Sequence, residues 1–366
     1  MEKESVQVSE GGHVAHHDDK PLLSVRNLKT YYFQDEGTVR AVDGASFDVH
    51  MGRTLGIVGE SGCGKTVTAK SILRLIEKTG RIVEGTIIYH RGTGGDREAE
   101  LDLTLLDAKG PEMRSIRGGE IALIFQEPMT SFSPVHSIGS QIMEAIRLHR
   151  QIGKQEAYAL GVEMLHRVGI PLPEQRMGEY PYQLSGGLRQ RAMIAMALSC
   201  NPRLLIADEP TTAVDVTTQA QILDLLGTLQ KESGMAIVFI THNLGVIAEI
   251  ADQVVVMYLG RVVEKAPVDD LFHAPKHPYT QALLRSIPSI QSVPREKLPT
   301  IIGAIPHPYN RPPGCPFHPR CASFMPGVCD RRAPRLLPVT QTQEVSCFLY
   351  HRDTEDDEWV EWTWKL

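Results

Sequence analysis

Five short runs of consecutive apolar residues lie along the chain, separated by segments in which apolar positions recur with helical spacing. These runs are Leu55–Val58, Ile121–Phe125, Leu204–Ala207, Ile237–Ile240 and Val254–Met257. Uninterrupted apolar runs of this length are typical of strands that are buried on both faces of a parallel sheet. Because the runs alternate with helical patterns, the sequence predicts an α/β domain over residues 21–266.

The regions outside these runs have other patterns. Residues 1–20 lack an apolar period and predict a disordered tail. The stretch from Arg91 to Gly119 is rich in glycine and charge, and we expect an exposed insertion there. Proline-rich sequence then leads into a segment with four cysteines, which predicts a separate C-terminal region over residues 267–350. The last segment, 351–366, is acidic and contains all three tryptophans, and its pattern indicates no role.

Charge and hydropathy exclude two classes of protein. The 366 residues include 38 Lys and Arg against 44 Asp and Glu, a formal net charge of −6. This balance argues against nucleic acid as the main partner, which would require a basic surface. No apolar run approaches the roughly 18–20 residues that a membrane-spanning helix needs, so we expect any membrane role to depend on separate membrane subunits.

A glycine-rich loop follows the first of the apolar runs and opens a helix. It has the G-x-x-x-x-G-K-[ST] pattern in its required strand–loop–helix context, and its residues are Gly59, Glu60, Ser61, Gly62, Cys63, Gly64, Lys65 and Thr66. Glycines let backbone N–H groups turn toward phosphates, and the helix N-terminus adds partial positive charge. We therefore predict that this phosphate-binding loop holds ATP, with Lys65 on the β- and γ-phosphates and Thr66 on Mg²⁺. The Cys63 thiol is either a small turn-filling group or, with Lys65 lowering its pKa, a reactive one.

Two adjacent carboxylates end another of the apolar runs. Asp208 and Glu209 follow Leu204–Ala207 directly, so they emerge at the C-terminal edge of a buried strand, where open α/β sheets bind ligands. We predict that Asp208 holds Mg²⁺ through water and that Glu209 is the general base for the attacking water.

The segment that begins at Leu184 carries a family resemblance. Its sequence, LSGGLRQR, resembles the LSGGQ signature of ABC-type ATPases, with Leu188 in place of the usual Gln. The order of motifs also matches that family: phosphate-binding loop, Gln126, signature, the two carboxylates, Asp215 and His242. The resemblance implies a P-loop ABC-type ATPase fold, with a mixed β core, an antiparallel β subdomain, a helical subdomain over about 127–198 and a C-terminal Cys-rich extension.

The same resemblance implies roles for the remaining motif residues. Gln126 would touch Mg²⁺ and the nucleotide, so that the implied Mg²⁺ ligands are Thr66, Gln126 and Asp208, while His242 would contact the γ-phosphate. ATP bound by a facing subunit would be contacted by Ser185, Gly186, Gly187 and Asp215. An aromatic side chain should stack on the adenine, and among Tyr31, Tyr32 and Phe33 we choose Tyr32.

A narrower resemblance lies in the C-terminal region. The segment His277–Leu284 (HPYTQALL) and the cysteine segment starting at Gly314 resemble the ATPase subunits of dipeptide, oligopeptide and nickel importers. This implies an ATP-hydrolysing subunit that energises import of peptides or a related solute. The implied partners are a second ATPase subunit, two integral membrane permease subunits and a substrate-binding protein, at the cytoplasmic face of a bacterial inner membrane. The segment 127–134 would begin the part of the helical subdomain that grips the permease. The alternative is a non-transport ABC ATPase that acts in regulation or repair.

Four cysteines lie close together in the C-terminal region: Cys315, Cys321, Cys329 and Cys347. Four thiolates suit a 4Fe-4S cluster or a structural Zn²⁺ equally in number. Zinc ribbons favour Cys-x₂-Cys pairs, which this spacing lacks, and members of the resembled group can bind a cluster; both points favour 4Fe-4S. Zinc and free or bridged thiols stay as alternatives.

Overall fold

The computed structural model of the chain describes residues 20–91, 99–126, 131–212, 214–287, 301 and 303–351. The tail predicted over residues 1–20 therefore lies outside the described residues except for Lys20, and so does the tryptophan-containing tail after His351. Residues 127–130, at the start of the segment predicted to grip a permease, are also outside them.

The larger of two sheets contains all five predicted apolar runs. Its strand order is β11-β12-β10-β9-β3-β8-β7-β6. The five parallel strands are β6 (Ile121–Ile124), β7 (Leu204–Asp208), β8 (Ala236–Thr241), β3 (Thr54–Val58) and β9 (Gln253–Tyr258). Every residue of β3, β7 and β8 is buried, as expected for central strands that are covered on both faces.

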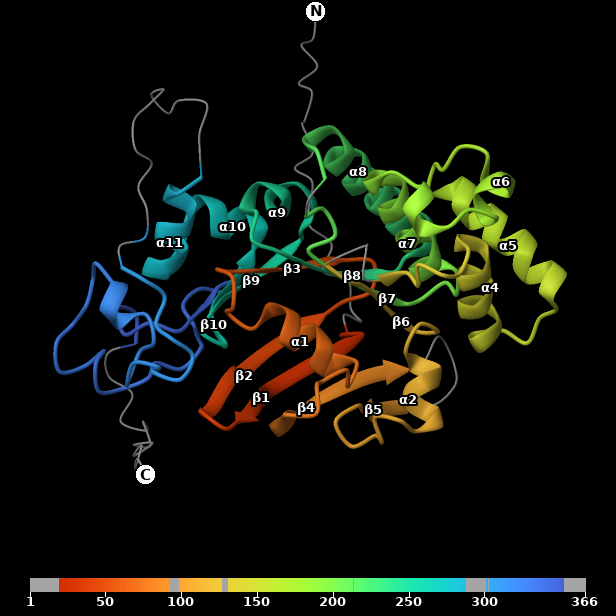
Figure 1. The fold of residues 1–366 in the computed structure, drawn as a ribbon. Coiled ribbons are helices and arrows are strands. Elements are labelled where there is room, and N and C mark those ends of the chain that lie inside the picture. The colour runs from red at the N-terminus through yellow and green to blue at the C-terminus, as the bar shows by residue number, and fades with distance from the viewer. Residues whose placement is uncertain are drawn as a thin grey trace, which may run out of the picture.

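The smaller sheet is antiparallel and lies on the other side of helix α1 (Figure 1). It has the order β2-β1-β4-β5, and its strands are β1 (Leu23–Gln34), β2 (Gly37–Val49), β4 (Gly80–Arg91) and β5 (Ala99–Asp102). One apolar cluster joins both sheets through α1 (Lys65–Ile72), whose Ala69 and Ile72 are buried in it. The phosphate-binding loop is therefore anchored at both of its ends by core packing.

The stretch from Arg91 to Gly119 is not simply an exposed insertion. It contributes β5 to the smaller sheet and a short helix, α2 (Pro111–Ile116). Leu103, Met113 and Ile116 in it are fully buried. These apolar side chains pack into the core despite the charged composition around them, so that part of the prediction is wrong.

Helices α4 (Ile138–His149), α5 (Lys154–Arg167), α6 (Pro173–Met177) and α7 (Gly186–Leu198) form a group at one end of the larger sheet (Figure 1), with the 3₁₀ turn η1 (Pro181–Gln183) before α7. In α4 the residues Ile138, Ile142 and Ile146 recur every four positions and are all buried, so one face of that helix packs inward. Helices α8 (Val216–Ser233) and α9 (Leu244–Ile250) follow strands β7 and β8.

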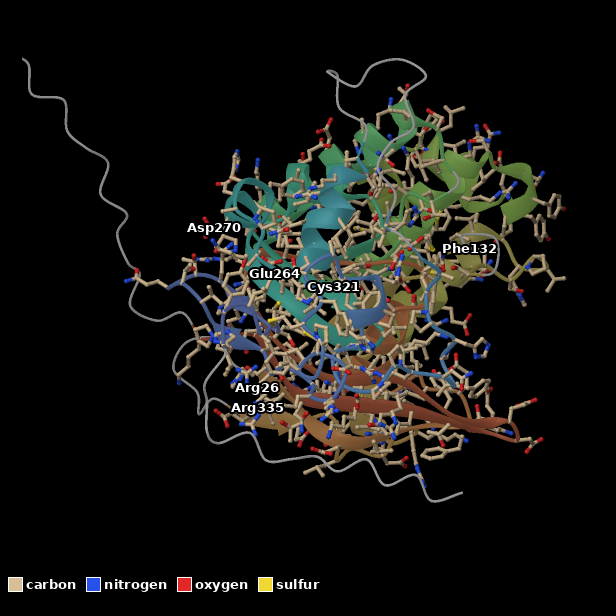
Figure 2. The ribbon with its side chains drawn as sticks, turned by 90° about the vertical axis from the view of Figure 1, so that its left-hand side faces the viewer. Arg26, Phe132, Glu264, Asp270, Cys321 and Arg335 are labelled. Carbon is tan, nitrogen blue, oxygen red and sulfur yellow. The ribbon has the colours of Figure 1, made fainter. Side chains whose placement is uncertain are left out.

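The C-terminal elements lie at the opposite end of the molecule (Figure 1). They are α10 (Val268–His273), α11 (Pro278–Arg285), the 3₁₀ turn η2 (His318–Arg320), β11 (Leu337–Pro338) and β12 (Glu344–Val345), and they follow strand β10 (Arg261–Pro267). β12 pairs with β10, so this region extends the larger sheet. Figure 2 looks onto this end, with Cys321 and Glu264 on the viewer's side. Among the helices of the described residues, none is long and apolar enough to cross a bilayer.

Candidate nucleotide-binding and hydrolysis site

The phosphate-binding loop connects β3 to the first turn of α1. Gly64 has a φ of 102°, and a Cβ there would lie 2.2 Å from the carbonyl oxygen of Ala41, so only glycine fits this close approach. The Lys65 ammonium is buried and donates hydrogen bonds to the carbonyl oxygens of Gly59 (2.8 Å) and Glu60 (3.2 Å). The loop thus curls around its own lysine, as a phosphate cradle requires.

A cavity of about 180 Å³ opens beside this loop. It brings together residues from three separate motifs: the phosphate-binding loop, Gln126 and Glu209. The predicted ATP-binding residues that line it are Ser61, Gly62, Gly64, Lys65, Thr66 and Gln126. The side chain of Cys63 is instead buried in the core. Burial raises the pKa of Cys63 despite the opposing charge of Lys65, so the expectation of a lowered pKa there is wrong and the turn-filling interpretation holds.

Glu209 is the centre of a hydrogen-bond network at the end of β7. One carboxylate oxygen accepts from Gln126 Nε2 (3.2 Å) and Thr212 Oγ1 (3.0 Å), and the other from His242 Nδ1 (3.1 Å). Burial pulls the pKa of Glu209 upward, but the hydrogen bonds from His242 and Thr212 outweigh it and leave the pKa below its usual range. Glu209 is therefore ionised near neutral pH, the state that a general base needs.

Asp208, one residue earlier, has the opposite environment. Burial raises its pKa, the charge of Glu209 adds to this, and a hydrogen bond from Thr66 opposes both. Its Oδ1 is buried and has no hydrogen-bond partner among the described residues. A second cavity, of about 190 Å³, is lined by Thr66, Gln126 and Asp208. These three oxygen-bearing side chains, among them the unsatisfied carboxylate oxygen of Asp208, fit Mg²⁺, which prefers oxygen ligands.

The signature residues lie away from both cavities. Ser185 caps α7, and its hydroxyl accepts from the Leu188 N–H at 3.4 Å. A Cβ on Gly186 would meet nothing within 4 Å, so the backbone there is open. Asp215 caps the neighbouring helix α8 and accepts from both the N–H and the hydroxyl of Thr218 (2.9 and 2.7 Å). The cavity beside the phosphate-binding loop is lined by none of the four residues predicted to contact ATP of a facing subunit, which are Ser185, Gly186, Gly187 and Asp215.

Tyr32 also lies outside the cavity-lining residues. Its hydroxyl donates to Glu77 (2.5 Å), whereas the hydroxyl of Tyr31 donates to Asp43 (2.6 Å). The adenine-stacking role of Tyr32 stays a prediction.

Sequence reasoning missed the contributions of the C-terminal region to this site. His307, Pro308 and Arg311 line the cavity together with the phosphate-binding loop. Farther along, the guanidinium of Arg320 donates to both carboxylate oxygens of Glu60 (2.7 and 3.0 Å). No sequence motif marks these residues, because their contacts depend on how distant parts of the chain pack together.

A second C-terminal contact reaches the same loop residue. The hydroxyl of Tyr279 on α11 accepts from the backbone N–H of Glu60 at 2.9 Å. Tyr279 is fully buried, and its ring packs on Tyr258 and Phe317 with centroid separations of 4.7 and 5.3 Å. The residue belongs to the segment that carried the peptide-importer resemblance, but that resemblance did not indicate this contact.

The four clustered cysteines line one small cavity next to His277 and Phe317. All four are free thiols, so the bridged alternative is wrong. Burial raises the pKa of Cys315 to about 12 and that of Cys347 to about 11, with the neighbouring cysteines adding to both. No group of three or more His, Cys, Asp or Glu side chains in the described ranges is arranged to hold a metal ion. The described residues therefore show no assembled 4Fe-4S or Zn²⁺ site.

Comparison with known proteins identifies the family. The ABC transporter family model matches residues 42–212, and that of the oligopeptide/dipeptide transporter C-terminal region matches 263–329. The oligopeptide transport ATP-binding protein AppD of Bacillus subtilis is 49% identical over 333 residues, which are 91% of this chain and 98% of AppD. The chain belongs to the ABC transporter ATPase family. The dipeptide transport ATP-binding protein DppD of Escherichia coli is 44% identical over 326 residues, 89% of this chain and 96% of that protein.

Solved structures agree with this ABC ATPase assignment. A dimeric bacterial ABC transporter cassette, MJ0796, superposes with a TM-score of 0.58 at 25% identity, over 67% of this chain and 98% of the cassette. A second structure of the same cassette, in a post-hydrolysis state, contains ADP and Pi. The predicted α/β ABC fold and ATPase activity are thus confirmed, and nothing favours the repair or regulatory alternative. The roles assigned to individual residues are not tested by these comparisons and stay predictions.

Proposed function

We propose that this ABC ATPase energises the import of peptides through separate membrane subunits. The observation that carries the proposal is its likeness to peptide transport ATP-binding proteins along almost the whole of both chains, C-terminal region included. The partners would be two permease subunits, a substrate-binding protein and a second ATPase subunit, with the chain at the cytoplasmic face of a bacterial inner membrane.

The chemistry follows from the two carboxylates at the end of β7. ATP would lie in the cavity with its phosphates on the loop, where Lys65 and the N-terminus of α1 offset their charge. Bound Mg²⁺ would neutralise charge that develops on the phosphates, and Thr66, Gln126 and Asp208 would hold it. Glu209, ionised and oriented by Gln126 and Thr212, takes a proton from the attacking water. His242 holds the other carboxylate oxygen and would contact the γ-phosphate.

Completion of the site would need a second ATPase subunit. Ser185, Gly186, Gly187 and Asp215 do not line the cavity in their own chain, yet Ser185 and its glycines present an exposed helix start suited to an anion. In the proposed arrangement these residues contact ATP that is bound by the facing subunit. This agrees with the dimeric state of the cassette MJ0796.

We also propose that the cysteine segment holds a metal centre. Cys315, Cys321, Cys329 and Cys347 would ligate a 4Fe-4S cluster, with Zn²⁺ as the alternative. What supports it is that four free thiols line one small cavity, because thiolates are the usual ligands of such clusters. Anaerobically purified protein with broad visible absorption and iron, lost together in Cys321→Ser, would support a cluster, whereas stoichiometric zinc without iron would contradict it.

Reconstitution tests the main proposal. The chain is assembled in vesicles with candidate permease subunits and a candidate substrate-binding protein from the same organism, and ATP hydrolysis is measured with and without peptides. Peptide-dependent stimulation and uptake are expected, and both should vanish with Glu209→Gln. Hydrolysis that responds to no peptide, in an assembly that does bind ATP, would contradict peptide import.

A further inference from the structure

The C-terminal segment around Arg311 forms one wall of the nucleotide cavity. The wall contains His307, Pro308 and Arg311, and it lines the cavity together with the loop residues Ser61, Gly62, Gly64, Lys65 and Thr66. Strand β2 supplies the adjoining residues Val39, Arg40 and Ala41. None of the established nucleotide-binding motifs includes the C-terminal wall.

The guanidinium of Arg311 has hydrogen-bond donors that its partner in the protein does not use. Its Nη1 donates to Asp43 Oδ2 at 2.7 Å, while its Nη2 is buried and has no hydrogen-bond partner among the described residues. An arginine carries five N–H donors in a planar fork, and a buried donor without an acceptor costs free energy. A ligand that brings an acceptor oxygen or nitrogen into the cavity would relieve this cost.

The charge of the wall also favours an anionic ligand. Asp43 is buried and is shared by Arg261 (3.1 Å) and Arg311 (2.7 Å). Its remaining oxygen accepts from the Tyr31 hydroxyl. One carboxylate thus faces two guanidinium groups. The surplus is positive, on the wall of a cavity that must take a polyphosphate.

The position of the wall determines which part of ATP it meets. Lys65, Thr66 and the start of α1 account for the β- and γ-phosphates, and Gln126 with Glu209 marks the bond that is hydrolysed. What remains is the AMP half of the nucleotide: the α-phosphate, the sugar and the base. The exposed ring of His307 and the neighbouring Pro308 and Val39 offer flat or apolar surface, on which a base can stack.

We propose that the segment His307–Arg311 binds the AMP half of the nucleotide, with Arg311 as the hydrogen-bond donor and His307 against the base. The C-terminal region is then part of the ATP site in the same chain. The inference concerns binding of nucleotide by this ABC ATPase and does not depend on which solute is imported.

The test measures nucleotide affinity in the full-length chain. Arg311→Gln should raise the Kd of both ATP and ADP about tenfold, the scale of a lost charged hydrogen bond. His307→Ala, an exposed position outside the core, should raise both about threefold or more. Neither change should alter the affinity for inorganic pyrophosphate, whose two phosphates match the β- and γ-positions and which lacks the AMP half. Exposed residues of the helical group give matched controls, Arg147→Gln and His166→Ala.

Two results would overturn the proposal. One is an affinity for ATP and ADP within twofold of the parent in both variants; a lower unfolding temperature of Arg311→Gln would then mark it as only the partner of Asp43. The other is an equal loss of pyrophosphate affinity, which would place the contact on the β- and γ-phosphates. Because His307→Ala does not disturb Asp43, the test stands even if Arg311→Gln folds poorly.

Discussion

The nucleotide cavity has two walls of different origin. The first is built from the phosphate-binding loop and the ends of β6 and β7, where each functional residue follows directly from a strand or opens a helix. The second is built from the C-terminal segment His307–Arg311, which is held at the cavity by tertiary contacts, such as the hydrogen bond from Arg311 to Asp43 on β2. Local chain geometry positions the first wall, and tertiary contacts position the second. The comparison predicts that damage to the first abolishes chemistry, while damage to the second weakens affinity and stability.

The largest effect is expected at Glu209. In Glu209→Gln the general base is lost while the shape is kept, so phosphate release should fall by about 10²–10⁴-fold. ATP affinity should stay near that of the parent, and the ATP-bound dimer should accumulate in size-exclusion chromatography. Glu249→Gln, an exposed change on α9, is the control. Undiminished hydrolysis would remove Glu209 from the role of base.

Lys65→Ala tests the same wall through binding. The ammonium group that holds Gly59 and Glu60 together would be absent, along with its charge on the phosphates. ATP affinity, measured by calorimetry, should fall about 10–100-fold, and the exposed Lys231→Ala should leave it unchanged. Equal affinity of Lys65→Ala and parent would contradict the loop assignment.

Arg320→Ala tests whether the C-terminal region supports the loop. The Arg320 side chain is 4% exposed and Glu60 is 21% exposed, so removal of one partner leaves a largely buried carboxylate. Loss of a buried partner costs about 3 kcal/mol of unfolding free energy, and we expect about 2 kcal/mol here because Glu60 retains some solvent.

A double-mutant cycle separates this pair from general damage. Adding Glu60→Gln to Arg320→Ala should restore part of the stability in denaturant unfolding, because no unpaired charge remains. Strictly additive losses would show that the two side chains do not act together.

The last expected effect appears only at low pH and concerns His277. Burial lowers the pKa of His277 to about 3, and the residue is 1% exposed. The unfolded chain has an ordinary histidine pKa near 6.5. Between about pH 6.5 and 3 it therefore binds a proton on this histidine, whereas the folded chain does not. Stability from this group is complete above about pH 6.5 and falls as the pH drops toward 3. At pH 5 the loss should be about 2 kcal/mol.

His277→Asn isolates this contribution from the carboxylates nearby. The His277 ring accepts from the Tyr279 N–H as the N-cap of α11, and asparagine can accept there without titrating. The buried Glu264, which accepts from the His277 N–H, titrates in both proteins. The difference in unfolding free energy between parent and variant should shrink from pH 7 to 5, and a constant difference would contradict the assignment.

The sequence was most informative where one segment determines its own structure. The five apolar runs became the five parallel strands, and the two carboxylates at Asp208 and Glu209 received opposite environments at one strand end. The α2 segment was misjudged because its six residues are too few for a helical period, although Met113 and Ile116 are buried. The contacts of Arg311 and Arg320 were not predicted, because a single arginine forms no recognisable sequence pattern. Only the folded chain brings these two residues to Asp43 and Glu60.

The pairing of β12 with β10 has a consequence for solubility. Without it, β10 would present a row of free backbone donors and acceptors, a template on which another chain could add a strand. β12 pairs with Glu264 and Lys265 of β10, and β11 pairs with β12. Each of the two strands has only two residues, and β11 ends in Pro338, which has no N–H to donate. This edge of the sheet is therefore short and poor in free backbone donors, which disfavours the addition of a strand from another molecule.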